Sequence, residues 1–80
     1  MRLPRDINGR ELAAALHKLG YVPVRQSGSH IRLRTEQNGE HLVTVPDHRP
    51  LRVGTLSSIL NSVAKHFGMT KDELIRRLFF

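Results

Sequence analysis

The sequence contains no cysteine and no tryptophan, and long apolar runs are missing as well. Without cysteine, neither a disulfide framework nor a thiol nucleophile can form. No stretch approaches the roughly 18 consecutive apolar residues that a membrane-spanning helix needs. The residues that follow Met1 do not have the pattern of a signal peptide. We therefore expect a cytoplasmic protein that does not bind a membrane.

Acidic residues are scarce relative to basic ones. The chain has 13 lysines and arginines against 7 aspartates and glutamates, which gives a formal net charge of +6. The isoelectric point of about 11.2 lies in the range that indicates a nucleic-acid partner. The length of 80 residues predicts a single domain, residues 1–80, that buries only roughly 60% of the surface of its unfolded chain.

The first half of the chain predicts one helix followed by three strands. Asn8 and Glu11 have the spacing of a capping box, and Gly20 can adopt the left-handed conformation that ends a helix. We therefore expect a helix over about Gly9–Leu19. A period of two follows it, and Asn38-Gly39 is typical of a hairpin turn. The strands are expected around residues 22–25, 30–34 and 42–45.

The alternation along these strands divides the predicted sheet into two faces. One face is apolar and is expected to contact the core; it comprises Val22, Val24, Ile31, Leu33, Val43 and Val45. The opposite face is mainly cationic and comprises Arg25, His30, Arg32, Arg34 and Thr44. A face of this kind can attract the phosphates of a nucleic acid.

The second half of the chain predicts two more helices. Apolar residues recur at helical spacing before the stop signal Gly68, namely Leu56, Ile59, Leu60, Val63 and Phe67. Thr70 and Glu73 form a second capping box, so a short helix is expected to about Leu78. The order α-β-β-β-α with a short C-terminal helix predicts an α+β fold. We expect a two-layer sandwich of the double-stranded-RNA-binding-domain (dsRBD) kind, with a three-stranded antiparallel sheet and helices on one face.

Five short motifs follow one another in a characteristic order along most of the chain. They are Leu19-Gly20-Tyr21, Arg25-Gln26-Ser27-Gly28-Ser29-His30, Val43-Thr44-Val45-Pro46-Asp47-His48, Gly54-Thr55-Leu56 and Ile59-Leu60. In this order they resemble the HicA family of toxin ribonucleases. The resemblance implies a dsRBD-like fold, an mRNA interferase activity that stops translation, and neutralisation by a HicB-type antitoxin. In that family the histidine of Gly-Ser-His is catalytic, which corresponds to His30.

The residues around His30 suit the chemistry of RNA cleavage. A proton must leave the ribose 2′-hydroxyl, charge on the pentacoordinate phosphorus must be stabilised, and the departing 5′-oxygen must be protonated. Histidine is the side chain that titrates nearest neutrality, so His30 is the candidate general acid/base, with the role of base preferred. Gly28 and Ser29 are expected to admit the RNA backbone to the turn and to bind a phosphate oxygen. Phosphate binding is also expected from Arg25, Arg32 and Arg34.

Other assignments stay open at this point. His48, in Pro46-x-His48, is a second candidate for the general acid. His41, Asp47 and His48 have no recognised metal-ligand spacing, so we expect a site without metal or other cofactor. The chain could be a non-catalytic RNA-binding module that uses the same basic face. It could also bind DNA through a helix-turn-helix, but Asp72 and Glu73 lie where such a helix would meet phosphates.

Overall fold

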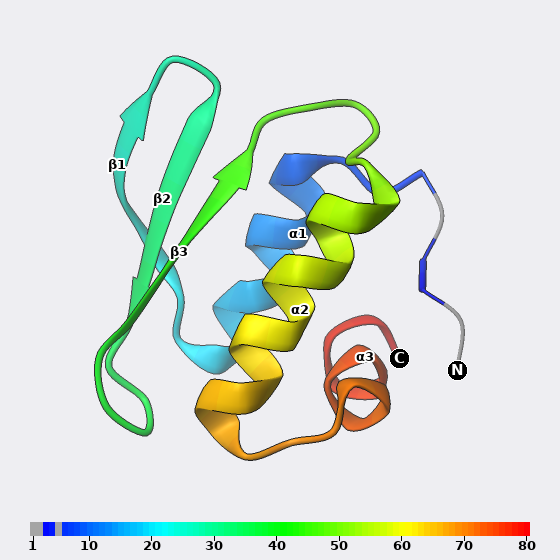
Figure 1. Cartoon of the computed structure of the whole chain (residues 1–80). Helices are drawn as coiled ribbons and strands as arrows, with labels where there is room; N and C mark the ends of the chain where they lie inside the picture. Colours follow the sequence, from blue (N-terminus) through cyan, green and yellow to red (C-terminus); the bar gives the residue numbers. More distant parts are fainter. Residues whose placement is uncertain (1–2, 5) are drawn as a thin grey trace.

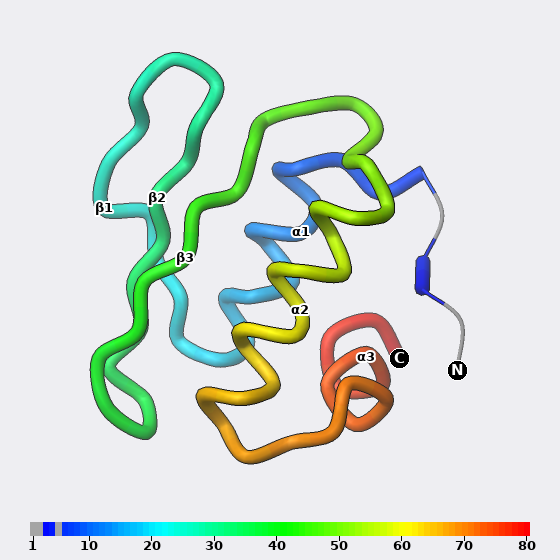
Figure 2. Tube along the Cα trace, in the orientation of Figure 1, coloured from blue at the N-terminus to red at the C-terminus, as the bar shows by residue number. Residues whose placement is uncertain are grey.

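The computed structural model describes residues 3–4 and 6–80 and arranges them in two layers, with the helices on one side of a sheet (Figures 1 and 2). The elements are α1 (Gly9–Leu16), the 3₁₀ helix η1 (His17–Leu19), β1 (Val22–Ser27), β2 (His30–Thr35), β3 (His41–Pro46), α2 (Val53–Phe67) and α3 (Lys71–Phe79). The predicted order and the α+β class are confirmed. Within the described residues, no helix has the length and apolar character that crossing a membrane requires.

The sheet is antiparallel, and β2 lies between β1 and β3. The two-residue turn Gly28-Ser29 joins β1 to β2, so that Ser27 is opposite His30. Gly28 has a φ of 58°, and glycine adopts such a positive angle at the first central position of a type II′ turn without a steric penalty. The second hairpin turns at the predicted Asn38-Gly39, where both residues have positive φ.

The core lies between the sheet and the helices. Four of the residues that were predicted to face it are buried, namely Ile31, Leu33, Val43 and Val45. The helices contribute the other large buried side chains, including Leu12, Leu16, Leu56, Leu60, Val63, Leu74, Ile75 and Leu78. α3 packs against α1 and α2, on the side of the helices away from the sheet (Figure 1). The C-terminal helix therefore closes the core rather than extending the sheet.

The prediction for the faces of β1 is wrong. Val22 and Val24 are 42% and 50% exposed, whereas their neighbour Tyr21 is fully buried. The pairing with β2 skips a residue at a bulge between Pro23 and Arg25, and the extra residue of a bulge shifts the alternation. β1 is exposed along its whole length. It is an edge strand of the sheet, and the turn end of the β1–β2 hairpin reaches past the helices (Figure 1).

Capping boxes fix the starts of α1 and α3, as predicted. The side chain of Asn8 accepts a hydrogen bond from the backbone N–H of Glu11, and the Glu11 carboxylate accepts one from the N–H of Asn8. Thr70 and Glu73 repeat the arrangement at α3. The first helix continues as η1 to its predicted end at Leu19. These local hydrogen bonds satisfy backbone donors that every helix start leaves unpaired.

Candidate functional site

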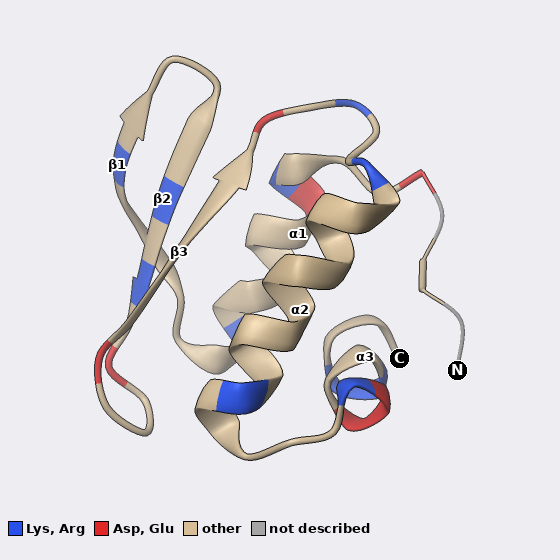
Figure 3. Cartoon of the chain, viewed as in Figure 1, with Lys and Arg blue, Asp and Glu red and all other residues tan. Residues whose placement is uncertain are grey.

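The outer face of the sheet, turned away from the helices, carries rows of side chains that run across the strands. Residues that pair directly in an antiparallel sheet point to the same face, so the register defines each row. The rows are Ser27 with His30 and Pro46, Arg25 with Arg32 and Thr44, and Val22 with Arg34 and Leu42. The strands contain no acidic residue, and the basic segments of the sheet lie on β1 and β2, while other basic segments lie on the helices (Figure 3). The predicted cationic face therefore exists.

His30 is the first residue of β2 and is exposed. Within the described residues, no side chain or backbone group accepts or donates a hydrogen bond to its imidazole ring. Its neighbour Gly28 has open space where a side chain would begin, since no atom lies within 4 Å of that position. The turn therefore leaves a large ligand free to approach the ring.

The loop after β3 is tied to this turn. The backbone N–H of Asp47 donates to the carbonyl of Ser29, with a nitrogen–oxygen distance of 2.6 Å. The Asp47 carboxylate accepts from Arg10 of α1, at 3.1 Å from both Nε and a terminal nitrogen. The carbonyl of His48 accepts from the N–H of Gly9 at 3.0 Å, and the His48 side chain is exposed. The structure thus holds the backbone of His48 beside the end of the sheet that carries His30.

The three predicted arginines are not equivalent. The guanidinium of Arg34 contacts the carboxylates of Glu36 and Glu40 at 2.8 and 2.6 Å. Among the described residues, neither Arg25 nor Arg32 has an acidic partner, and both side chains are exposed. Because a paired arginine has little charge left for a phosphate, we expect phosphate binding to centre on Arg25 and Arg32.

The arrangement offers an accessible imidazole, two cations in the adjacent row and a turn that carries further hydrogen-bonding groups. A face of this kind can bind a phosphodiester and transfer a proton at it. Sequence reasoning missed the contacts of Asp47 with Ser29 and Arg10, because no spacing of residues in the sequence indicates them. In the described part of the chain, no three histidine, aspartate or glutamate side chains are grouped so that they could hold a metal ion.

Comparison with known proteins gives one match. A family model described as the HicA toxin of bacterial toxin–antitoxin systems matches residues 9–69. No curated protein and no solved structure matches the chain. The matched segment runs from the first residue of α1 to the residue before the cap of α3. It includes every residue of the site described above.

Proposed function

Since the chain belongs to the HicA toxin family of bacterial toxin–antitoxin systems, we propose that this toxin is a metal-independent endoribonuclease that cleaves mRNA in the cytoplasm and so inhibits translation. One observation carries the proposal: the exposed imidazole of His30 lies in the row next to the unpaired cations Arg25 and Arg32. An acid/base group beside cations without counterions is what cleavage of a phosphodiester requires.

His30 removes the proton from the ribose 2′-hydroxyl in this mechanism. The 2′-oxygen then forms a bond to phosphorus while the bond from phosphorus to the 5′-oxygen breaks. The products are a 2′,3′-cyclic phosphate and a 5′-hydroxyl. His48 is our candidate for the donor of a proton to the departing 5′-oxygen, because the bond of Asp47 to Ser29 holds its loop beside the turn.

The cations and the turn have separate tasks. Arg25 and Arg32 neutralise the phosphate and the extra negative charge that develops on it in the transition state. Gly28 leaves room for the RNA backbone, and Ser29 offers its hydroxyl and N–H as hydrogen-bond donors to phosphate oxygens. The carbonyl of Ser29 is already occupied by Asp47, which keeps the turn in place while RNA binds.

The decisive experiment compares the intact protein with a His30→Ala variant on a short single-stranded RNA, in the presence of EDTA. We expect the variant to lose roughly 10²- to 10⁴-fold in cleavage rate, the range for removal of a general acid/base. The matched control is His17→Ala, which removes an exposed histidine on η1 and leaves the rate unchanged. Cleavage by the wild type with equal rates in both variants would contradict the role of His30. RNA binding without cleavage would instead support the binding-module alternative.

The role of the cations is tested by binding. Replacing Arg32 with alanine should weaken binding to all RNA sequences alike and reduce the slope of log affinity against log salt concentration by about 0.7. Lys65→Ala is the control, because Lys65 is an exposed cation on α2, on the other layer of the molecule. An equal effect of the two substitutions would show that RNA responds only to net charge and not to the sheet face.

The toxin's partner is an antitoxin, for which we propose a HicB-type protein that shields the outer face of the sheet. Covering β2 would block the approach of RNA to His30. Hydrogen exchange in the complex should then show protection at the turn Gly28-Ser29 and little change at the end of α3. Protection confined to Phe79 and Phe80 would show that the antitoxin does not act by direct blockade.

A further inference from the structure

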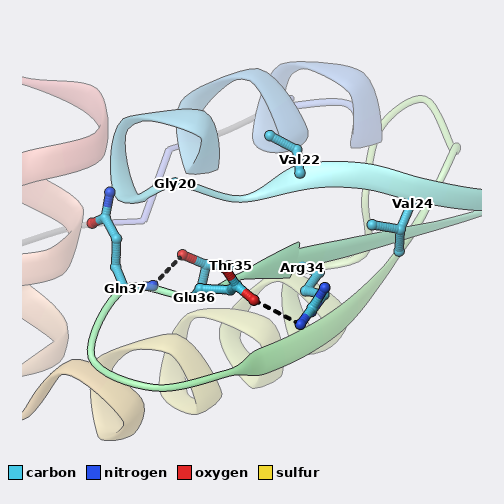
Figure 4. Close-up of a pocket in the computed structure, with 7 residues that line it drawn as sticks. All are labelled: Gly20, Val22, Val24, Arg34, Thr35, Glu36 and Gln37. Atoms are coloured by element: carbon cyan, nitrogen blue, oxygen red, sulfur yellow. Dashed lines mark hydrogen bonds and ion pairs between the residues drawn. The ribbon is translucent and has the colours of Figure 1, made fainter.

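A pocket of about 470 Å³ opens at the end of β2 opposite to His30. Val22 and Val24 of β1 stand on one side of it, and Arg34, Glu36 and Gln37 line the other (Figure 4). Val22 is the register partner of Arg34, so both lie on the outer face of the sheet. The pocket therefore borders the face that carries His30, although Gly20 and the buried Thr35 also line it.

The distance along β2 places the pocket within reach of the same RNA strand. His30 and Arg34 are four positions apart on β2, which corresponds to about 13 Å at roughly 3.3 Å per residue. Arg32 lies between them. An RNA strand that is bound at His30 and continues over Arg32 would reach the pocket with one of its bases. That base would be at most about four nucleotides from the one at His30, if neighbouring bases keep a stacked spacing of roughly 3.4 Å.

The charges in the pocket disfavour a phosphate. Arg34 is paired with both Glu36 and Glu40, so one positive charge meets two negative charges. A phosphate at this point would be repelled, whereas an uncharged group that forms hydrogen bonds would not be. The apolar side chains of Val22 and Val24, which are half exposed, can cover the face of a planar ring and remove it from water.

The polar groups favour one kind of base. The side-chain amide of Gln37 has no hydrogen-bond partner within the described residues, and Arg34 Nε is buried without an acceptor. One oxygen of the Glu36 carboxylate already accepts from Arg34 at 2.8 Å. The lone pairs that remain can accept two neighbouring N–H groups, and the amide of Gln37 can donate to a carbonyl. Guanine presents the complementary groups on one edge, with adjacent N1–H and N2–H donors beside the O6 acceptor. Adenine and cytosine present a ring acceptor where guanine has N1–H.

We propose that this pocket is a base subsite that selects guanine near the cleaved bond of a single-stranded RNA. The proposal rests on the proposed function, because it assumes an RNA strand on the outer face. In this subsite Glu36 and Gln37 bind the hydrogen-bonding edge of the base, and Val22 and Val24 contact the face of its ring. His30 and the unpaired arginines then act on the backbone of the same strand.

The test measures binding to 2′-O-methyl oligouridines that contain one guanine or one adenine, which cannot be cleaved at the modified riboses. The wild type should prefer the guanine oligonucleotide by roughly five-fold or more, as for a bidentate contact to a base. Glu36→Gln should abolish the preference. Glu40→Gln is the matched control, since it removes a carboxylate from the same Arg34 but does not line the pocket, and it should keep the preference.

The outcomes separate this inference from the proposed function. Equal affinity of the wild type for the two oligonucleotides overturns the subsite while leaving RNA cleavage intact. An equal loss of preference in Glu36→Gln and Glu40→Gln overturns the direct contact and traces the effect to the charge of Arg34. If the wild type binds no RNA at all, both proposals fail. A surface that instead serves the antitoxin alone would show no guanine preference and reduced antitoxin affinity in Val24→Asp.

Discussion

Replacing Tyr21 with phenylalanine should destabilise the protein although it leaves the ring in place. Tyr21 is fully buried, and its hydroxyl oxygen lies 2.6 Å from Nδ1 of His41. The substitution removes the donor and leaves Nδ1 without this partner, a loss worth about 1–2 kcal/mol. For a domain of this size that corresponds to a fall of roughly 4–16 °C in Tm.

The same bond makes the effect dependent on pH. Burial, together with the nearby His66, lowers the pKa of His41. The unfolded chain therefore binds a proton at His41 more readily than the folded one, and the free energy of unfolding falls as the pH drops through about 6.5. A phenol that donates to Nδ1 stabilises the neutral imidazole, and burial raises the pKa of Tyr21 to about 12, so the donor stays protonated. Without it, the pKa of His41 should rise and the loss of stability in acid should be smaller.

Urea unfolding at about pH 7.5 and about pH 5 measures both effects for Tyr21→Phe. The control is Ser62→Ala, which removes the exposed contact of Ser62 Oγ with Nε2 of His41 at 3.2 Å and should cost under about 0.5 kcal/mol. Equal stability of Tyr21→Phe and the wild type at the higher pH would refute the reasoning. So would a steeper loss in acid for Tyr21→Phe than for the wild type.

Two further predictions concern stability and are read out by the midpoint of urea unfolding. Gly9→Ala should cost about 1–3 kcal/mol, because a Cβ there would lie 1.9 Å from the carbonyl oxygen of Pro46; Gly54→Ala, with open space around it, should gain up to about 1 kcal/mol. Equal midpoints for the two variants would contradict this steric argument. Thr35→Val should cost about 1–3 kcal/mol, because the buried hydroxyl donates to the carbonyl of Leu19 at 2.7 Å. A midpoint like that of the wild type would show that this bond adds nothing to stability.

Much of the fold is predictable because its signals are local. The capping boxes that begin at Asn8 and Thr70 depend on residues three positions apart, and both form as the spacing predicts. The alternation of Ile31 and Leu33 with Arg32 fixes the faces of β2, because a central strand has a partner on each side and a helical layer beneath it. These parts need no information from distant segments.

The errors come from long-range geometry. The alternation along β1 placed Val22 and Val24 in the core, but the bulge and the register with β2 turn them outward. No local spacing indicates a partner for His66 of α2. Its Nε2 donates to the carbonyls of Gln37 and Gly39, so it ties α2 to the second hairpin. Neither result follows from the residues within a few positions of the one concerned.

In the candidate site, too, the local features are predictable from the sequence and the long-range contacts are not. The turn and the strand pattern place Arg25, His30 and Arg32 on one face from sequence alone, and the register agrees with this placement. The pairing of Arg34 with Glu36 and Glu40 was not foreseen. Glu40 meets Arg34 only because the second hairpin folds back on β2. Charge counted along the sequence therefore overstates the charge that the face offers to a phosphate.

The pairing of Arg34 with Glu36 and Glu40 makes the two ends of the outer face electrostatically different. All the basic residues of the strands lie on β1 and β2, but only Arg25 and Arg32 lack an acidic partner within the described residues. Positive potential is therefore concentrated beside His30 rather than spread along β2, since paired charges cancel over distances beyond their separation. A polyanion lowers its energy most by placing a phosphate beside Arg25 and Arg32, in the row next to His30. In the proposed mode of binding, the opposite end, where Arg34 is neutralised, faces an uncharged part of the same ligand.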